Sequence, residues 1–236
     1  MENIFIILLG LSMIYIASTS RLLAHVNMLV AQGLLLFLVC LSGFTKEPWF
    51  DLAIFTNKEL FINNISHLWS LLFVIFETLF IKAVIIPWFL HKVIKKTHAH
   101  RDTDANIPHF YCMVISSVIL FAGFLTANIA SPELKMIHPM YFGISLAIII
   151  ISLWLITIKH KVISNVIDFI TMENGIFLLS LSLAKEMPII VNLGVLLDLF
   201  IAVFILGILV REIDTEFHHD MEVSHLSDLK DYEYND

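Results

Sequence analysis

The sequence predicts an all-α membrane protein with seven transmembrane helices. Of its 236 residues, 58% are hydrophobic and only 15% are charged, whereas soluble domains average about 45–50% and about 25%. The apolar residues also gather in long blocks of roughly 20, which is the length of helix that crosses a bilayer core of about 30 Å. A transmembrane barrel is excluded, because its strands would be about ten residues long with alternating polarity.

Seven apolar blocks are long enough, and we expect one helix from each: 3–19, 22–44, 67–90, 109–130, 138–158, 164–183 and 189–210. Together they form a transmembrane domain over residues 1–210. The first block resembles a signal peptide in length, but Met1 to Gly10 contains a single charge, Glu2, and no basic residue. We therefore expect it to remain as an uncleaved helix.

An acidic tail over residues 211–236 follows the last block. It holds nine acidic and two basic residues, which accounts for the net charge of −7, since the remaining chain is balanced. Such a segment is typical of a solvated terminus, and the alternative is a docking segment for a cytoplasmic partner.

The distribution of lysine and arginine between the loops predicts the orientation of the chain. Four lysines fall on one side of the membrane and eight basic residues on the other, which the positive-inside rule makes cytoplasmic. The first group is Lys46, Lys58, Lys135 and Lys185, and the second is Arg21, Lys92, Lys95, Lys96, Arg101, Lys159, Lys161 and Arg211. The N-terminus is then outside the membrane, and the tail is cytoplasmic.

A weak internal repeat relates the second and sixth blocks. Segment 30–42 aligns with segment 172–184, so that Gly33 matches Gly175, while Ala31 stands where the second copy has Glu173. Each segment lies in the middle helix of a three-helix group. This pattern suggests two parallel three-helix units joined by one linking helix.

Four ionisable residues fall near the centres of the expected helices: Glu77, Lys82, Glu173 and Asp198. Each such charge costs about 2.5–3.5 kcal/mol on insertion scales. One lysine cannot balance three carboxylates, and this surplus indicates a protonatable path or a cation site. The alternative is a set of ion pairs that only joins helices.

The spacing of these charges predicts their partners. Glu77 and Lys82 are five residues apart, which is about 140° around an α-helix and about 7.5 Å along it, so we expect each to face a different neighbouring helix. Glu173 and Asp198 lie at comparable depth on consecutive helices, and two close carboxylates can share a proton. Secondary candidates lie nearer the helix ends: Asp168, Lys185 and Glu186.

No motif for bond chemistry is present in the sequence. It contains no nucleophile elbow, phosphate loop, dinucleotide fingerprint or zinc motif, and its two cysteines, Cys40 and Cys112, form no C-x-x-C pair. A basic patch of the kind that binds nucleic acid is also missing. We therefore expect no catalytic residue, no metal, no cofactor and no nucleic-acid partner.

Two segments resemble a known family. Residues 167–210, IDFITMENGIFLLSLSLAKEMPIIVNLGVLLDLFIAVFILGILV, resemble component E of hydrogenase-4, a membrane subunit of formate hydrogenlyase-type complexes, and FETLFIKAVIIPWFL, residues 76–90, resembles the third helix of that family. The last three blocks are similar to subunit K of respiratory complex I and to the matching small subunit of multisubunit sodium/proton antiporters. Glu173 and Asp198 stand where the complex I subunit has two buried glutamates, although Asp198 is the shorter acid.

This resemblance implies a non-catalytic membrane-arm subunit of an energy-converting, hydrogenase-like oxidoreductase complex in a bacterial or archaeal cytoplasmic membrane. Its partners would be antiporter-like membrane subunits, a peripheral hydrogenase-like redox module and the lipid bilayer. Glu77, Lys82, Glu173 and Asp198 would contribute to proton or sodium translocation coupled to electron transfer. The alternative is the small subunit of a multisubunit cation/proton antiporter that has no redox partner.

Overall fold

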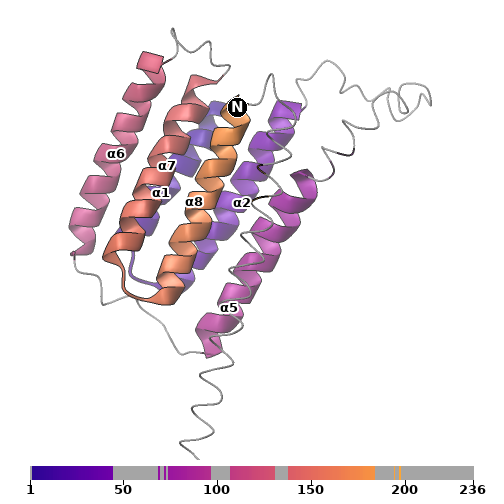
Figure 1. Cartoon of the computed structure of the whole chain (residues 1–236). Coiled ribbons are helices and arrows are strands. Elements are labelled where there is room, and N and C mark those ends of the chain that lie inside the picture. Colours follow the sequence, from indigo (N-terminus) through magenta and orange to yellow (C-terminus); the bar gives the residue numbers. More distant parts are fainter. Residues whose placement is uncertain are drawn as a thin grey trace, which may run out of the picture. The chain divides into compact units, whose positions relative to one another are not determined.

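The computed structural model describes residues 2–44, 69, 72, 74–96, 107–130, 138–183, 194 and 197, and these are almost entirely helical (Figure 1). A π-helix over Phe76–Ile85 continues directly into an α-helix over Ile86–Lys96, so that the two form one rod. The elements in chain order are α1 (Glu2–Ser18), α2 (Leu22–Phe44), η2 (Phe76–Ile85), α5 (Ile86–Lys96), α6 (His109–Ala130), α7 (Pro139–Ile158) and α8 (Val162–Leu183).

The described helices follow the first six expected blocks closely. The main difference is the third, whose helix continues to Lys96 instead of ending at residue 90. Of the seventh block only Gly194 and Leu197 are described, both helical, and Gly194 lies close to the Ser180 side chain of α8. The tail, residues 211–236, lies outside the described residues.

Four helical segments are long and apolar enough to cross a membrane: Leu22–Gly43, His109–Ile129, Pro139–Ile158 and Val162–Ser182. The apolar part of α1, Asn3–Ser18, is shorter. Several large apolar side chains on α6 are exposed, among them Phe110 and Phe121, as is expected of a surface that faces lipid. The chain is thus a multi-pass membrane protein, and the expected total of seven crossings stays a prediction.

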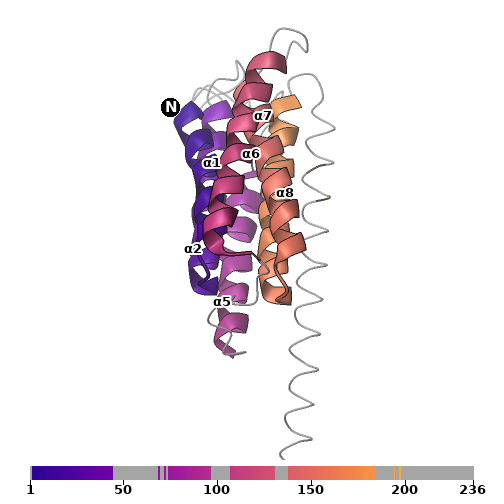
Figure 2. The same cartoon turned by 90° about the vertical axis from the view of Figure 1, so that its left-hand side faces the viewer.

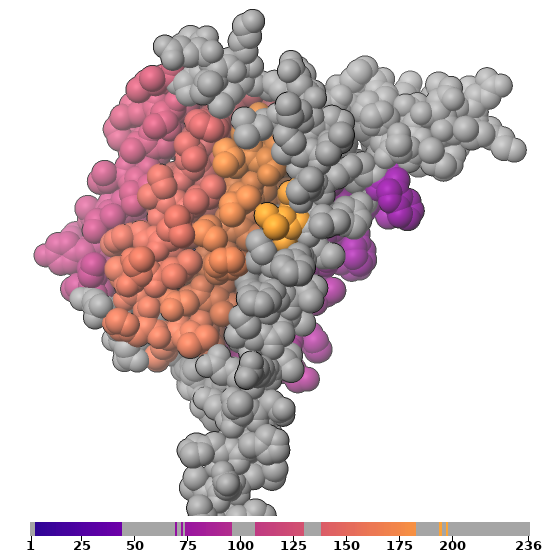
Figure 3. Space-filling model, in the orientation of Figure 1, coloured from indigo at the N-terminus to yellow at the C-terminus, as the bar shows by residue number. Residues whose placement is uncertain are grey.

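The helices pack into a bundle in which α2 touches elements from both halves of the chain. It contacts α1, the η2–α5 rod and α8, while α7 packs against both α6 and α8. In the side view, α1 and α2 lie together and α7 lies beside α8 (Figure 2). In the space-filling view, α6, α7 and α8 form a continuous packed surface (Figure 3). The core includes Ile6, Met13, Leu36, Ile144 and Phe177.

The segments related by the weak repeat lie against each other in this bundle. They fall in α2 and α8, which are in contact and run in the same direction (Figure 1). Short turns precede both helices, so α1 and α7 also run alike. This arrangement fits two parallel units, and most of the block expected to supply the third helix of the second unit, residues 189–210, lies outside the described residues.

The π-helix η2 has a local cause in Pro87, the second residue of α5. In an α-helix the ring of Pro87 would clash with the carbonyl of Ala83, four residues earlier, and the residue has no N–H to donate. The backbone instead widens, and the N–H of Ile86 bonds to the carbonyl of Ile81, five residues back. Such π-turns are rare and frequently mark functional sites.

Glycines allow the backbones of α6 and α7 to approach closely. A Cβ atom added at Gly123 would lie 2.5 Å from the carbonyl oxygen of Gly143, which is far inside van der Waals contact. Small residues allow this kind of close packing between membrane helices.

Substituting Gly123 with alanine is therefore expected to push α6 away from α7. Overpacking of this kind costs about 1–3 kcal/mol, so the midpoint of thermal unfolding in detergent should fall. Gly43→Ala is the matched control, because nothing lies within 4 Å of the Cβ that it adds. Equal midpoints for the two variants would contradict the close backbone approach.

Candidate functional site

A buried lysine lies between two buried glutamates. The Nζ atom of Lys82 is 3.8 Å from Oε1 of Glu77 and 3.8 Å from Oε1 of Glu173. Lys82 and Glu77 come from η2, and Glu173 comes from the middle of α8. All three side chains are 3% exposed or less, so a single ammonium group is shared by two carboxylates inside the bundle.

The π-helix explains why Glu77 and Lys82 meet. Hydrogen bonds in a π-helix join residues five apart, so residues five apart lie about one turn from each other on the same face. Our expectation that Glu77 and Lys82 face different helices assumed an α-helix and is wrong for this pair. It holds in one respect, since Lys82 also reaches Glu173 on another helix.

An aromatic ring closes the site on one side. The Lys82 ammonium lies 4.6 Å from the centre of the Phe177 ring, and Phe177 follows Glu173 by about one turn of α8. Such a cation–π contact stabilises a cation that has lost much of its water. Phe177 therefore supports the charged form of Lys82 in a place where solvent cannot.

The three charges do not balance. Counting the described residues alone, the cluster carries one excess negative charge when all three groups are ionised, which is costly in the membrane interior. The two 3.8 Å separations also exceed the length of a direct N–H···O hydrogen bond, about 2.7–3.2 Å. The attraction is therefore mainly Coulombic, and the cluster is suited to gain and lose a proton or to attract a small cation.

A second buried ion pair lies at the turn between α7 and α8. The Nζ atom of Lys159 is 2.8 Å from Oδ2 and 3.0 Å from Oδ1 of Asp168, and Asp168 is fully buried. Asp168 was a secondary candidate for the proton path, and the sequence pattern placed Lys159 in a loop. Their short contacts make them a close pair that joins the two helices of the hairpin.

A chain of buried hydrogen bonds runs from α8 through α2 to α1. Nδ2 of Asn174 donates to Oε1 of Gln32 at 3.2 Å, and Nε2 of Gln32 donates to Oγ of Ser12 at 2.7 Å. The Ser12 hydroxyl donates in turn to the carbonyl of Leu9 at 2.6 Å. Neither Gln32 nor Ser12 was predicted from the sequence. One signal for Gln32 was available, because the repeat aligns it with Asn174.

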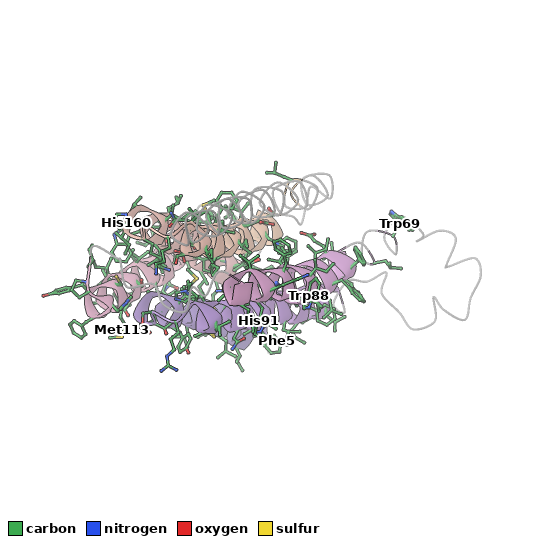
Figure 4. The ribbon with its side chains drawn as sticks, turned by 90° about the horizontal axis from the view of Figure 1, so that it is seen from below. Phe5, Trp69, Trp88, His91, Met113 and His160 are labelled. Carbon is green, nitrogen blue, oxygen red and sulfur yellow. The ribbon has the colours of Figure 1, made fainter. Side chains whose placement is uncertain are left out.

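Three of the candidate residues, Asp198, Lys185 and Glu186, lie outside the described residues, so the predicted pairing of Glu173 with Asp198 stays a prediction. In the part of the chain that the structure describes, no group of three or more His, Cys, Asp or Glu side chains could hold a metal ion. Polar and aromatic residues such as His160 and Trp88 are exposed at the surface of the bundle (Figure 4).

Comparison with known proteins shows distant relatives. The chain is 26% identical over 160 residues to an uncharacterized protein of Mycobacterium tuberculosis strain H37Rv, covering 64% of this chain and 69% of that protein. It is 24% identical over 156 residues to "Hydrogenase-4 component E" of Escherichia coli strain K12, covering 63% of this chain and 68% of the relative. No protein-family model and no solved structure matches the chain. We conclude that this multi-pass membrane protein is distantly similar to hydrogenase-4 component E.

Proposed function

We propose that the chain is a membrane-arm subunit of an energy-converting, hydrogenase-like oxidoreductase complex, where its buried charges take part in proton or sodium translocation. One observation supports this function above all: Lys82 lies between Glu77 and Glu173, sealed from solvent. A cluster with more acid than base suits a group that exchanges protons or cations. The distant similarity to a hydrogenase component supports the redox setting.

The cluster can serve as a relay because, among the described residues, its lysine lies at the same distance from two carboxylates. At about 4 Å and an effective dielectric constant of about 20, each ion pair is worth about 4 kcal/mol before desolvation is counted. A proton that arrives on Glu77 weakens its attraction for Lys82, and the ammonium then favours Glu173. A proton on Glu173 has the opposite effect. The charge would thus pass laterally between η2 and α8.

The remaining parts of the proposal extend this cluster. Asp198 would continue the polar line beyond Glu173, with Asp168, Lys185 and Glu186 nearer its ends. Antiporter-like membrane subunits would adjoin the chain, and a peripheral hydrogenase-like redox module would supply the electrons. We place the complex in a bacterial or archaeal cytoplasmic membrane, with the N-terminus outside and the acidic tail in the cytoplasm.

The subunits that accompany the chain decide between this proposal and its alternative. The intact complex is to be purified from membranes through an affinity tag on the chain, and its subunits identified by mass spectrometry. Hydrogenase-like subunits are the expected result. Antiporter-like subunits alone would instead favour the small subunit of a cation/proton antiporter without a redox partner.

The substitution Glu173→Gln tests the relay itself. We expect normal assembly, since the amide keeps the shape of the side chain, together with a loss of coupled ion movement on the order of a hundredfold, the lower end of what a positioned proton-transfer group contributes. The measurement is the number of ions moved per electron pair in membrane vesicles.

Thr171→Val is a matched control on the same helix. Thr171 is fully buried, and its hydroxyl donates to the carbonyl of Ile167 at 2.8 Å within α8, so coupling should stay normal. Full coupling in Glu173→Gln would falsify the relay role of this residue.

A further inference from the structure

We propose that Gln32 is a positioning residue that sets the separation of Lys82 and Glu173. This inference rests on the proposed function of the cluster and adds to it a residue that touches none of the three charges in the contacts described above. Gln32 lies on α2, which contacts both η2 and α8. It is therefore placed to hold η2 and α8 at the separation at which Lys82 and Glu173 meet.

Gln32 fixes α8 through a directional contact. Its carbonyl oxygen accepts from Nδ2 of Asn174, the residue next to Glu173, and its own amide is anchored on Ser12 of α1. All three polar side chains are almost fully buried. A buried amide pair is sensitive to direction as well as distance, so it restricts both the rotation and the height of α8.

The residue after Gln32 fixes η2. A Cβ atom added at Gly33 would lie 2.9 Å from both the Cα and the backbone N of Ala83, so the two backbones touch here without an intervening side chain. Ala83 is the residue next to Lys82. Two adjacent residues of α2 therefore hold the immediate neighbours of the two charges, Ala83 beside Lys82 and Asn174 beside Glu173.

A small rotation of α8 is enough to change the cluster. Side chains reach about 5–6 Å from a helix axis, so a rotation of about 20° moves a carboxylate by about 2 Å. The Lys82–Glu173 separation of 3.8 Å would then no longer match the Lys82–Glu77 separation. Gln32 has no titratable group, so its effect on a proton relay would act through the placement of Glu173.

The test uses Gln32→Leu in the complete complex. We expect near-normal assembly, a loss of coupling of about fivefold, the factor that one lost hydrogen bond implies, and a shift of the pH at which coupling is half-maximal. Exchanging the two side chains, Gln32→Asn with Asn174→Gln, keeps an amide pair and should restore most of the coupling. Ser152→Ala, a buried polar site on α7, is the control and should change nothing.

Two further results separate positioning from a structural role and from failure of the relay itself. In coupling, Gln32→Leu should add no further loss to that of Glu173→Gln, whereas independent, additive losses would overturn the proposal.

Cross-linking measures the distance between positions 82 and 173 without reference to coupling. Lys82→Cys is joined to Glu173→Cys with a short thiol reagent, in a Cys40→Ala, Cys112→Ala background. Gln32→Leu should lower its yield by about fivefold. An unchanged cross-linking yield overturns the positioning role of Gln32. This outcome does not depend on the Glu173→Gln experiment, which tests the relay proposal separately.

Discussion

Substitution of Lys82 with methionine is expected to abolish coupled ion movement and to reduce the amount of assembled protein. The ammonium is the shared partner of Glu77 and Glu173 at 3.8 Å, and removal of one partner of a buried ion pair typically costs 3–5 kcal/mol, roughly what a marginally stable protein can lose. The measurements are the quantity of complex in membranes and the ions moved per electron pair.

A second substitution separates the stability of the protein from its function. Lys82→Met combined with Glu77→Gln removes one positive and one negative charge, so assembly should recover substantially while coupling stays absent. If the double variant coupled normally, the charges would only join helices, as a structural adaptor requires. Lys92→Met is the control, because Lys92 is exposed on α5 and exposed charges contribute little to stability.

The positions of the helices could be predicted from the sequence because the bilayer imposes one length on every crossing. Apolar blocks of about 20 residues therefore give α2, α6 and α7 with bounds that are close to those observed. The pairing within η2 was predicted wrongly, because the spacing of Glu77 and Lys82 was interpreted with the 3.6 residues per turn of an α-helix. Pro87 is visible in the sequence, but its effect on the hydrogen bonds before it, and hence on the Glu77–Lys82 pair, becomes visible only in the structure.

The candidate residues of the site could be predicted more fully than their partners. Glu77, Lys82 and Glu173 are recognisable because a charge inside an apolar block is expensive. Their pairing depends on which helices adjoin around the bundle, and a single sequence does not contain that order. The contact between η2 and α8 is therefore new information, and it supplies the partner on another helix that Lys82 needed.

Lys159 illustrates the same limit at the end of a helix. Its apolar block ends at residue 158, so the sequence places the lysine in a loop that faces the cytoplasm. In the structure it is the C-terminal cap of α7, in extended conformation, and its side chain turns inward to the buried Asp168. A long side chain can bury its stem and charge when an acid nearby compensates, and block length does not reveal this.

Asp168→Leu should therefore be strongly destabilising, whereas simultaneous substitution of Asp168 and Lys159 should not. Removing the acid leaves the Lys159 ammonium buried without its carboxylate at 2.8 Å, and we expect a loss of about 3–5 kcal/mol in the free energy of unfolding. Asp168→Leu with Lys159→Met replaces the pair by apolar side chains and should regain most of this loss, since apolar replacements of buried ion pairs are often neutral. Thermal unfolding of the detergent-solubilised chain measures both.

The same pair of variants decides whether Asp168 belongs to the relay. Thr157→Ala, an exposed site near the end of α7, is the control for the hairpin and should unfold like the unmodified chain. If the double variant is stable and its complex couples normally, the Lys159–Asp168 pair only holds the hairpin together. If it is stable but coupling is lost, Asp168 is a station of the path, because the substitution has then removed a proton-exchanging group without removing the fold around it.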